Sequence, residues 1–174
     1  RVIELGKDAK NLFYINSPAA TTLIVPPSNK EVSEGPLREA AAKLGVPFTL
    51  YTGRALDELP IRPSSFDAAL CFDMLDSAPQ QVAAAAVQLL VGSLTPNGRM
   101  LFLESERVGM PTLCRELGLS VEYDTEGGFD VGIVKRRNVG KTSAKKKGKA
   151  GNKGPSEKSV AAMAERGGFG AAAA

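Results

Sequence analysis

The stretch "VIELGKDAKNLFYI", residues 2–15, decides how the chain begins. Its first four residues predict a short buried strand, and Gly6 follows that strand directly. Many nucleotide-binding α/β folds open in this way, because a glycine without Cβ lets ligand and backbone approach closely. Two more glycines usually follow, and here those positions hold Asp8 and Lys10. The loop therefore has the frame of a nucleotide site in which two glycines have been replaced.

Length and composition suit one domain with a tail. The chain has 174 residues, of which 43% are hydrophobic and 6% aromatic. No apolar run reaches the ~18 residues of a membrane span, so no transmembrane segment is expected. No N-terminal signal or transit pattern is visible. Because the chain begins at Arg1 without Met, we expect a processed or truncated product.

The absence of histidine narrows the possible chemistry. Histidine-based triads and histidine metal sites are excluded, so a general base would have to be Asp, Glu, Lys, Tyr or Cys. The two cysteines, Cys71 and Cys114, lie in apolar runs and form no C-x-x-C motif. We expect buried free thiols, and neither a zinc site nor a disulfide framework.

Strands and helices are predicted to alternate along the chain. Predicted strands cover residues 2–5, 21–25, 47–53, 66–72, 99–105, 119–123 and 129–136, and predicted helices cover residues 33–45, 76–94 and 110–118. The almost wholly apolar "FDAALCF" is typical of a central parallel strand covered on both faces. This order predicts a mostly parallel sheet that ends in an antiparallel hairpin strand.

Smaller features refine this prediction. Asp76 or Ser77 is expected to cap the helix over residues 76–94, and the "TPNG" of residues 95–98 reads as a turn. Phe13 and Tyr14 are expected to pack in the core.

Three stretches carry a resemblance to a known family. "VIELG" resembles the start of a first cofactor motif, and "LDELPIRPSSFDAALC" resembles an acidic-x-Leu-Pro segment followed by a fourth strand. "LTPNGRMLFLE" resembles the turn into a fifth strand. Together with the element order, residues 1–135 resemble the class I S-adenosylmethionine (SAM)-dependent methyltransferases, nearest to the quinone and thiol methyltransferases. The resemblance implies an α/β fold with a three-layer Rossmann-like sheet.

The same resemblance shows damage to the cofactor motifs. The family pattern is E-x-G-x-G-x-G, and here only Glu4 and Gly6 match it. A non-glycine residue at a position that needs a positive φ is strained by about 1–3 kcal/mol, although Asp tolerates that geometry better than most residues. The acidic residue that would accept hydrogen bonds from the ribose is replaced by Val25.

The positions that match the family's cofactor site form the candidate set. These residues are Glu4, Gly6, Lys7, Asp8, Leu56, Asp57, Phe72 and Asp73, and Asp57 matches the acidic residue near the adenine. Structural alternatives stay open: Glu4 and Gly6 could be retained for turn geometry alone, and the interpretation of Asp57 as a solvated loop carboxylate is slightly favoured over a role near the adenine. No catalytic residue is assigned, and SAM is the one implied cofactor. The family usually carries helices before its first strand, which here begins at residue 2, so the cleft is open unless a longer precursor or a partner supplies a lid.

Charge divides the chain into two parts. Residues 1–134 carry 11 basic and 17 acidic side chains, whereas residues 135–174 carry 11 basic and 2 acidic ones. We therefore expect a methyltransferase-like domain over residues 1–137 and a basic Lys/Gly-rich tail over residues 138–174. The lysines from Lys135 to Lys158 either stay solvated or bind an anionic partner, such as RNA or an acidic protein surface.

Three hypotheses for the function follow from these observations. The first is a non-catalytic structural or accessory subunit of a larger assembly, whose partners are protein subunits and whose setting is organellar, in a plastid or mitochondrion, or otherwise cytoplasmic. The second is an active SAM-dependent methyltransferase that acts on a small lipophilic substrate. The third is an RNA-associated factor that acts through the basic tail.

Overall fold

The computed structural model describes residues 1–8, 10–14, 19–27 and 33–135. The basic tail predicted over residues 138–174 lies outside these described residues, as does its proposed contact with an anionic partner. Within the described part of the chain, no helix is both long enough and apolar enough to cross a membrane.

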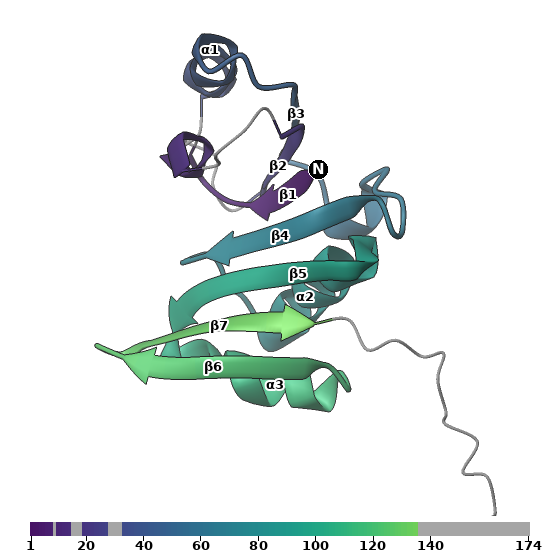
Figure 1. The fold of residues 1–174 in the computed structure, drawn as a ribbon. Helices are drawn as coiled ribbons and strands as arrows, with labels where there is room; N and C mark the ends of the chain where they lie inside the picture. The colour runs from purple at the N-terminus through teal and green to yellow at the C-terminus, as the bar shows by residue number, and fades with distance from the viewer. Residues whose placement is uncertain (9, 15–18, 28–32, 136–174) are drawn as a thin grey trace, which may run out of the picture. The chain divides into compact units, whose positions relative to one another are not determined.

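A sheet of seven strands in the order β3-β2-β1-β4-β5-β7-β6 forms the middle layer (Figure 1). The strands are β1 (Val2–Leu5), β2 (Thr21–Val25), β3 (Phe48–Thr52), β4 (Phe66–Phe72), β5 (Leu94–Ser105), β6 (Ser120–Glu126) and β7 (Phe129–Lys135). Strands β1 to β5 pair in parallel, and β7 pairs antiparallel with both β5 and β6. The predicted fold class is therefore confirmed, including the antiparallel strand near the end.

Burial along the strands follows their sequences. Every residue of β2, "TTLIV", is buried, as expected for an inner strand covered on both faces. In contrast, β6 has the sequence "SVEYDTE" and is exposed along nearly all of its length. Charged side chains on an edge strand hinder pairing with another sheet, which explains why this polar sequence is tolerated at the edge.

Helices cover the two faces of the sheet unequally. The helices α2 (Gln80–Ser93) and α3 (Met110–Glu116) pack against the larger core on one face. On the other face, α1 (Glu34–Lys43) and the 3-10 helix η1 (Lys10–Tyr14) pack over β2 and β3. No helix of the described residues covers β4, β5, β7 and β6 on that second face, which is turned toward the viewer in Figure 1.

The start of α2 differs from the prediction. Asp76 and Ser77 do not cap the helix, because a turn closed by a hydrogen bond from the Ala78 N–H to the Leu75 carbonyl holds them ahead of it. Pro79 is the N-cap residue instead, and its carbonyl accepts hydrogen bonds from the amides of Val82 and Ala83. The predicted cap at residues 76–77 is therefore wrong.

The "TPNG" segment also differs from the prediction. It lies inside β5, which begins at Leu94, and the register against β4 shifts between Phe66 and Ala68. A Cβ on Gly98 would lie 2.9 Å from the Leu94 Cβ, so the chain folds back on itself at this bulge and only glycine fits. The predicted turn is thus a bulge within a longer strand.

Two aromatic side chains are not in the core. Phe13 is 64% exposed and Tyr14 is 81% exposed, because the short η1 turns only Leu12 inward. The prediction that Phe13 and Tyr14 pack in the core is wrong. Cys71 and Cys114 are buried free thiols, as predicted.

Candidate functional site

The carboxyl ends of β1 and β4 meet at the point where the strand order reverses. From β1 the chain continues to β2 on one side, whereas β4 lies on its other side. In open α/β sheets the crevice beyond such a switch point is the usual place for a ligand. The candidate site is therefore built from the loops that follow β1, β2, β3 and β4.

Glu4 and Gly6 are packed against each other at the end of β1. The Glu4 side chain is buried, and the Asn11 Nδ2 donates a hydrogen bond to its Oε1 at 2.6 Å. A Cβ on Gly6 would lie 2.8 Å from that oxygen and 3.1 Å from the Leu23 Cδ1. Packing around the Glu4 carboxyl is thus sufficient to explain why glycine stands at position 6.

Burial changes the acidity of Glu4. Removal from water raises the pKa of Glu4 to about 7, although the hydrogen bond from Asn11 acts in the opposite direction. The nearby charge of Asp8 adds to the increase in this pKa. Near neutral pH the Glu4 carboxyl therefore exchanges between its protonated and ionised forms.

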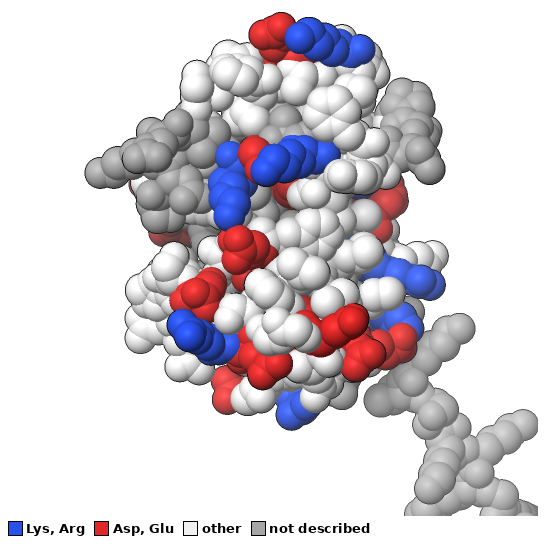
Figure 2. All heavy atoms as spheres, turned by 90° about the vertical axis from the view of Figure 1, so that its left-hand side faces the viewer, with Lys and Arg blue, Asp and Glu red and all other residues white. Residues whose placement is uncertain are grey.

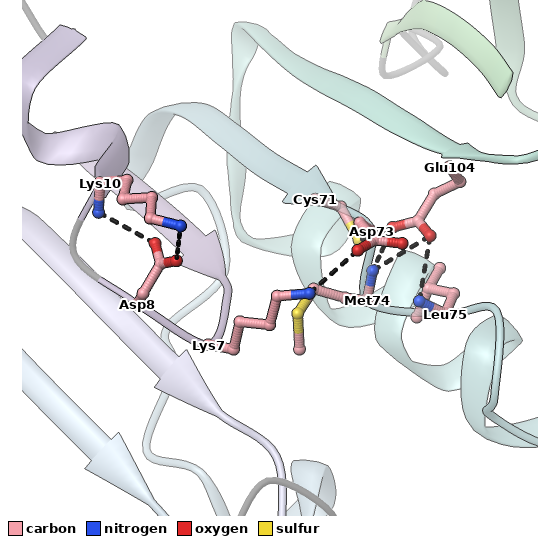
Figure 3. Close-up of polar contacts among 8 residues, drawn as sticks. All are labelled: Lys7, Asp8, Lys10, Cys71, Asp73, Met74, Leu75 and Glu104. Carbon is pink, nitrogen blue, oxygen red and sulfur yellow. Dashed lines mark hydrogen bonds and ion pairs between the residues drawn. The ribbon is translucent and has the colours of Figure 1, made fainter. Parts of the chain in front are cut away.

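Side chains of the loop after β1 are paired within the chain. The Lys7 Nζ lies 2.9 Å from the Asp73 Oδ2 and so joins the ends of β1 and β4 (Figure 3). Asp8 accepts a hydrogen bond from the backbone N–H of Lys10 at 3.0 Å and pairs with its Nζ at 3.2 Å. The Lys7–Asp73 pair raises the pKa of Lys7, mainly through its hydrogen bond.

Backbone strain lies at a different residue from the one expected. Asp8 stands where the family has glycine, but its φ is not positive. The prediction of backbone strain at Asp8 is therefore wrong. Among the described non-glycine residues, Ser64 and Asp73 have positive φ, and Asp73 adopts 52° at the end of β4. A hydrogen bond of 2.8 Å from the Asp73 N–H to the Leu103 carbonyl holds this conformation.

Glu104 secures the turn that follows Asp73. Its carboxylate is fully buried at the end of β5 and accepts hydrogen bonds from the backbone N–H of Met74, at 3.0 and 3.1 Å, and of Leu75, at 3.0 Å (Figure 3). The Cys71 thiol donates a third bond at 3.2 Å. Burial raises the pKa of Glu104, and the two backbone bonds partly offset that increase.

A cavity of about 640 Å³ lies beside this turn. Its lining is mainly apolar and includes Leu5, Pro26, Leu56, Met74, Val82 and Ala86. Asp57, on the short 3-10 helix η2 (Leu56–Glu58), is the one carboxylate among the described residues that line it. This cavity can hold a flat or lipophilic molecule and offers one charged acceptor at its rim.

The predicted residues fall into separate groups. Leu56 and Asp57 line the cavity, Lys7 and Asp73 form the ion pair, and Glu4 and Asp8 point to partners within the first loop. Phe72 lies on the opposite face of the sheet, in a hollow with Leu103 and Val131, because consecutive strand residues alternate between faces. Val25 is buried beside Leu37 in the core under α1 and offers no acceptor.

Two residues that shape this region were not predicted as site residues. Asn11 and Glu104 were not singled out, although each provides a hydrogen bond that shapes the site. For Glu104 a signal was present, because Met100, Phe102 and Glu104 share one side of an alternating strand. For Asn11 the sequence held no signal, since its partner Glu4 lies on another element. Among the described residues, no group of three or more His, Cys, Asp or Glu could hold a metal ion.

Charges are unevenly distributed along the edge where β4 and β5 end. Figure 2 looks onto this edge and shows basic side chains near its middle and, in its lower half, many acidic side chains with some basic ones among them. The lower half corresponds to β5, β7 and β6, where exposed acidic residues include Glu106, Asp124 and Glu126. The excess of acidic side chains there does not favour contact with nucleic acid.

Comparisons with known proteins bear on the fold. No protein-family model matches the sequence, and no curated protein matches it. Among solved structures, the chain is similar to an O-methyltransferase family protein from Burkholderia thailandensis, with a TM-score of 0.61 and 16% identity over 78% of this chain and 50% of that chain. A SAM-dependent methyltransferase from Aquifex aeolicus gives a TM-score of 0.58 and 16% identity, over 76% of this chain and 80% of that chain.

A third similar structure holds the cofactor. It is an O-methyltransferase from neocarzinostatin biosynthesis in complex with SAM and 2-hydroxy-5-methyl naphthoic acid, with a TM-score of 0.57 and 12% identity over 77% of this chain and 48% of that chain. The chain thus spans about half the length of two of these three proteins. At these identities the likeness concerns the fold, and the described domain has the class I SAM-dependent methyltransferase fold.

Proposed function

We propose that this chain is a methyltransferase-like domain with a degenerate SAM site, and that it acts as a non-catalytic structural or accessory subunit of a larger assembly. The observation that carries the proposal is the Lys7–Asp73 ion pair of 2.9 Å, which joins the loops after β1 and β4. The cofactor's methionine part would have to lie between these two loops. The chain's own side chains therefore make the contacts that a ligand would make there.

The polar groups around the site support the same proposal. Among the described residues, no buried side-chain nitrogen or oxygen lacks a hydrogen-bond partner. Glu4 is bonded by Asn11, and Glu104 is bonded by the amides of Met74 and Leu75. A site shaped for a polar cofactor tends to leave groups that the cofactor itself must satisfy, and these carboxylates are already satisfied.

The fit to SAM is incomplete. Asp57 at the cavity rim suits the adenine amino group, which needs an acceptor. The ribose hydroxyls lack their carboxylate, because Val25 is apolar and its side chain packs toward α1. The methionine part meets the Lys7–Asp73 pair. We therefore derive no methyl-transfer step for this chain.

Calorimetry with SAM tests the proposal. We expect no heat of binding at millimolar SAM for the full chain. Binding near micromolar would contradict the proposal, and Asp57→Asn would then identify the adenine contact if it weakened that binding. Glu58→Gln is the matched control, because Glu58 lies on the same 3-10 helix as Asp57 but does not line the cavity.

A gain-of-binding variant tests the cause of the degeneracy. Asp8→Gly combined with Lys10→Gly restores two glycines of the family pattern and removes the Asp8–Lys10 pair. If these side chains obstruct the cofactor, the double variant should bind SAM measurably where the parent chain does not. If neither protein binds SAM, then Val25 and the Lys7–Asp73 pair are the cause of the lost binding.

The second candidate is an active SAM-dependent methyltransferase that acts on a small lipophilic substrate. The cavity of about 640 Å³ favours it, because the lining is apolar and lies next to Asp57. Release of S-adenosylhomocysteine from SAM, assayed with a panel of thiols, phenols and quinols, tests this candidate. Turnover with any of them would replace the accessory role.

The proposed setting in an organelle and the hypothesis of an RNA-associated factor depend on other observations. The RNA hypothesis rests on the lysines from Lys135 to Lys158, and nearly all of these lie outside the described residues. Cell fractionation would place an accessory subunit with its complex in a plastid or mitochondrion. Recovery of the chain free of any complex would contradict the proposed role.

A further inference from the structure

One face of the sheet carries a regular set of apolar rows. Register places Leu70, Leu101 and Ile133 side by side across β4, β5 and β7, and Phe72, Leu103 and Val131 form the next row. Each row ends at an acidic residue of β6: the first at Glu122 and the second at Asp124. A third, shorter row leads from Phe129 to Glu126.

These rows are open to solvent. Leu101 is 39% exposed, Leu103 37%, Phe129 39% and Val131 43%. A hollow of about 570 Å³ is lined by Leu101, Leu103 and Val131, with Phe72 and Ile133 also in its lining. Contiguous exposed apolar surface of this kind marks an interaction site rather than ordinary surface. We call the three rows and this hollow the open face.

The width of the open face matches one helix. On one side η1 and α1 pack over β2 and β3 and the Asn11 side chain of η1 contacts Glu4 of β1, and on the other side the acidic residues of β6 begin. Between these borders lie β4, β5 and β7, which at about 4.8 Å per strand span about 14 Å. An α-helix with its side chains is about 10–12 Å across. A single helix can therefore lie between η1 and β6.

The acidic border indicates the charge of the occupant. Glu122, Asp124 and Glu126 are all exposed along β6; Lys135 pairs with Glu122 and lowers its pKa, and the charge of Arg99 acts in the same direction. Phosphate groups of nucleic acid or of an anionic membrane would be repelled by this border. A helix with lysine or arginine along one flank would instead gain attraction from it.

We propose that the open face binds an amphipathic helix of a partner protein, with its apolar side on the three rows and its basic flank along β6. The proposal deepens the accessory role described above and rests on that role for the existence of a partner. It does not depend on the loops that follow β1 and β4.

A designed peptide serves as the probe. It is a helix of about 18 residues, or ~27 Å, with leucines on one face and lysines along one flank. The full chain should bind this labelled peptide saturably in fluorescence anisotropy, and a matched peptide with glutamates in place of the lysines should not bind. Higher salt should weaken the binding, because part of the attraction is between exposed charges.

Variants of the chain locate the binding. Leu101→Glu should weaken the peptide about tenfold or more, because it places a charge in the middle of an apolar contact. Leu44→Glu is the matched control, because Leu44 is also 39% exposed but lies at the end of α1. Asp124→Asn with Glu126→Gln should weaken binding about threefold and reduce its salt dependence, and these changes leave the core intact.

Five results would overturn the proposal. Three concern the peptide: equal binding by Leu101→Glu and Leu44→Glu, equal binding of the glutamate peptide, and absence of saturable binding to the full chain. Two would assign the face to another occupant: self-association abolished by Leu101→Glu would indicate a second copy, and binding seen only after deletion of residues 138–174 would indicate the chain itself. Calorimetry with SAM reports on the other site, so failure of one proposal is distinguishable from failure of the other.

Discussion

Two surfaces of the same sheet differ in whether their side chains find partners within the chain. At the ends of β1 and β4, polar side chains are paired within the chain, as in the Lys7–Asp73 and Asn11–Glu4 contacts. On the open face, Leu101 and Val131 remain exposed to water with no helix of the described residues above them. Exposed apolar area costs about 25 cal/mol per Å² relative to burial, whereas a satisfied polar crevice gains little from a ligand. The comparison teaches that the polar side chains at the ends of β1 and β4 find partners within the chain, whereas the apolar rows of the open face are left uncovered by the described residues.

The largest expected effect tests how firmly the crevice is built. Glu104→Ala should lower the free energy of unfolding by about 4 kcal/mol, because it leaves three donors without an acceptor and creates a cavity. Glu104→Gln keeps one acceptor oxygen and should lose less. Urea denaturation of both variants measures the difference. Equal stability of the alanine variant and the parent would show that solvent or another group replaces the carboxylate.

The next effect tests the support beneath the open face. A Cβ on Gly132 would lie 2.6 Å from both the Glu122 carbonyl oxygen and the Phe102 Cζ. Gly132→Val should therefore destabilise the fold by about 3 kcal/mol through overpacking. Thermal unfolding measures this change, and Gly127→Val is not a suitable control because Gly127 has a positive φ. Gly92→Ala, at an open position on α2, should cost nothing by comparison.

A pH-dependent effect is expected from Glu4. The pKa of Glu4 is raised from 4.5 to about 7 in the folded chain, so the folded state binds a proton that the unfolded state has lost. The resulting stabilisation is complete below pH ~4.5 and is lost as pH rises through about 7. Glu4→Gln should thus be more stable than the parent by about 2–3 kcal/mol above pH 7, with little difference near pH 4. Parallel pH dependence of both proteins in denaturant titrations would show that Glu4 is not buried in solution.

The smallest effect concerns the ion pair itself. Lys7→Ala removes the contact with Asp73, but both side chains are about half exposed. We expect a loss below about 1 kcal/mol, since exposed pairs contribute little. A loss of 2 kcal/mol or more in urea denaturation would mean that the pair stabilises the fold and not merely the loop. In that case the crevice would be even less available to a ligand.

The fold was predictable because its signals are local. Buried strands such as β2 and β4 read as apolar runs of the right length, and the helices between them carry their own spacing and stop at glycines such as Gly45. The predictions of the helix cap and of the turn at residues 95–98 were wrong, because the conformation at those positions depends on packing and backbone geometry that the local sequence does not show. Asp76 lies in a turn ahead of α2, and Gly98 allows a bulge that only the packing against Leu94 reveals.

The candidate site was predictable in part. Family-like spacing pointed to the loops that hold Lys7, Asp57 and Asp73, and the structure brings Lys7 and Asp73 into contact. The family-like spacing did not indicate that Phe72 lies on the face of the sheet away from the cavity. Nor did it indicate that Glu104 holds the turn after β4. The contact between Glu104 and Met74 joins residues 30 positions apart, so strand alternation could indicate that Glu104 is buried but not which groups it binds.

The sequence by itself determined the order of the strands and helices, the lack of histidine chemistry and the replacement of two motif glycines, because these depend on residue types and near neighbours. Only the tertiary structure decided that Lys7 reaches Asp73, that Glu104 grips Met74 and Leu75, and that the apolar rows of β4, β5 and β7 stay uncovered. The physical reason is that pairing of charges and burial of apolar area are set by distances in space, which the register of the sheet establishes only when all seven strands are in place.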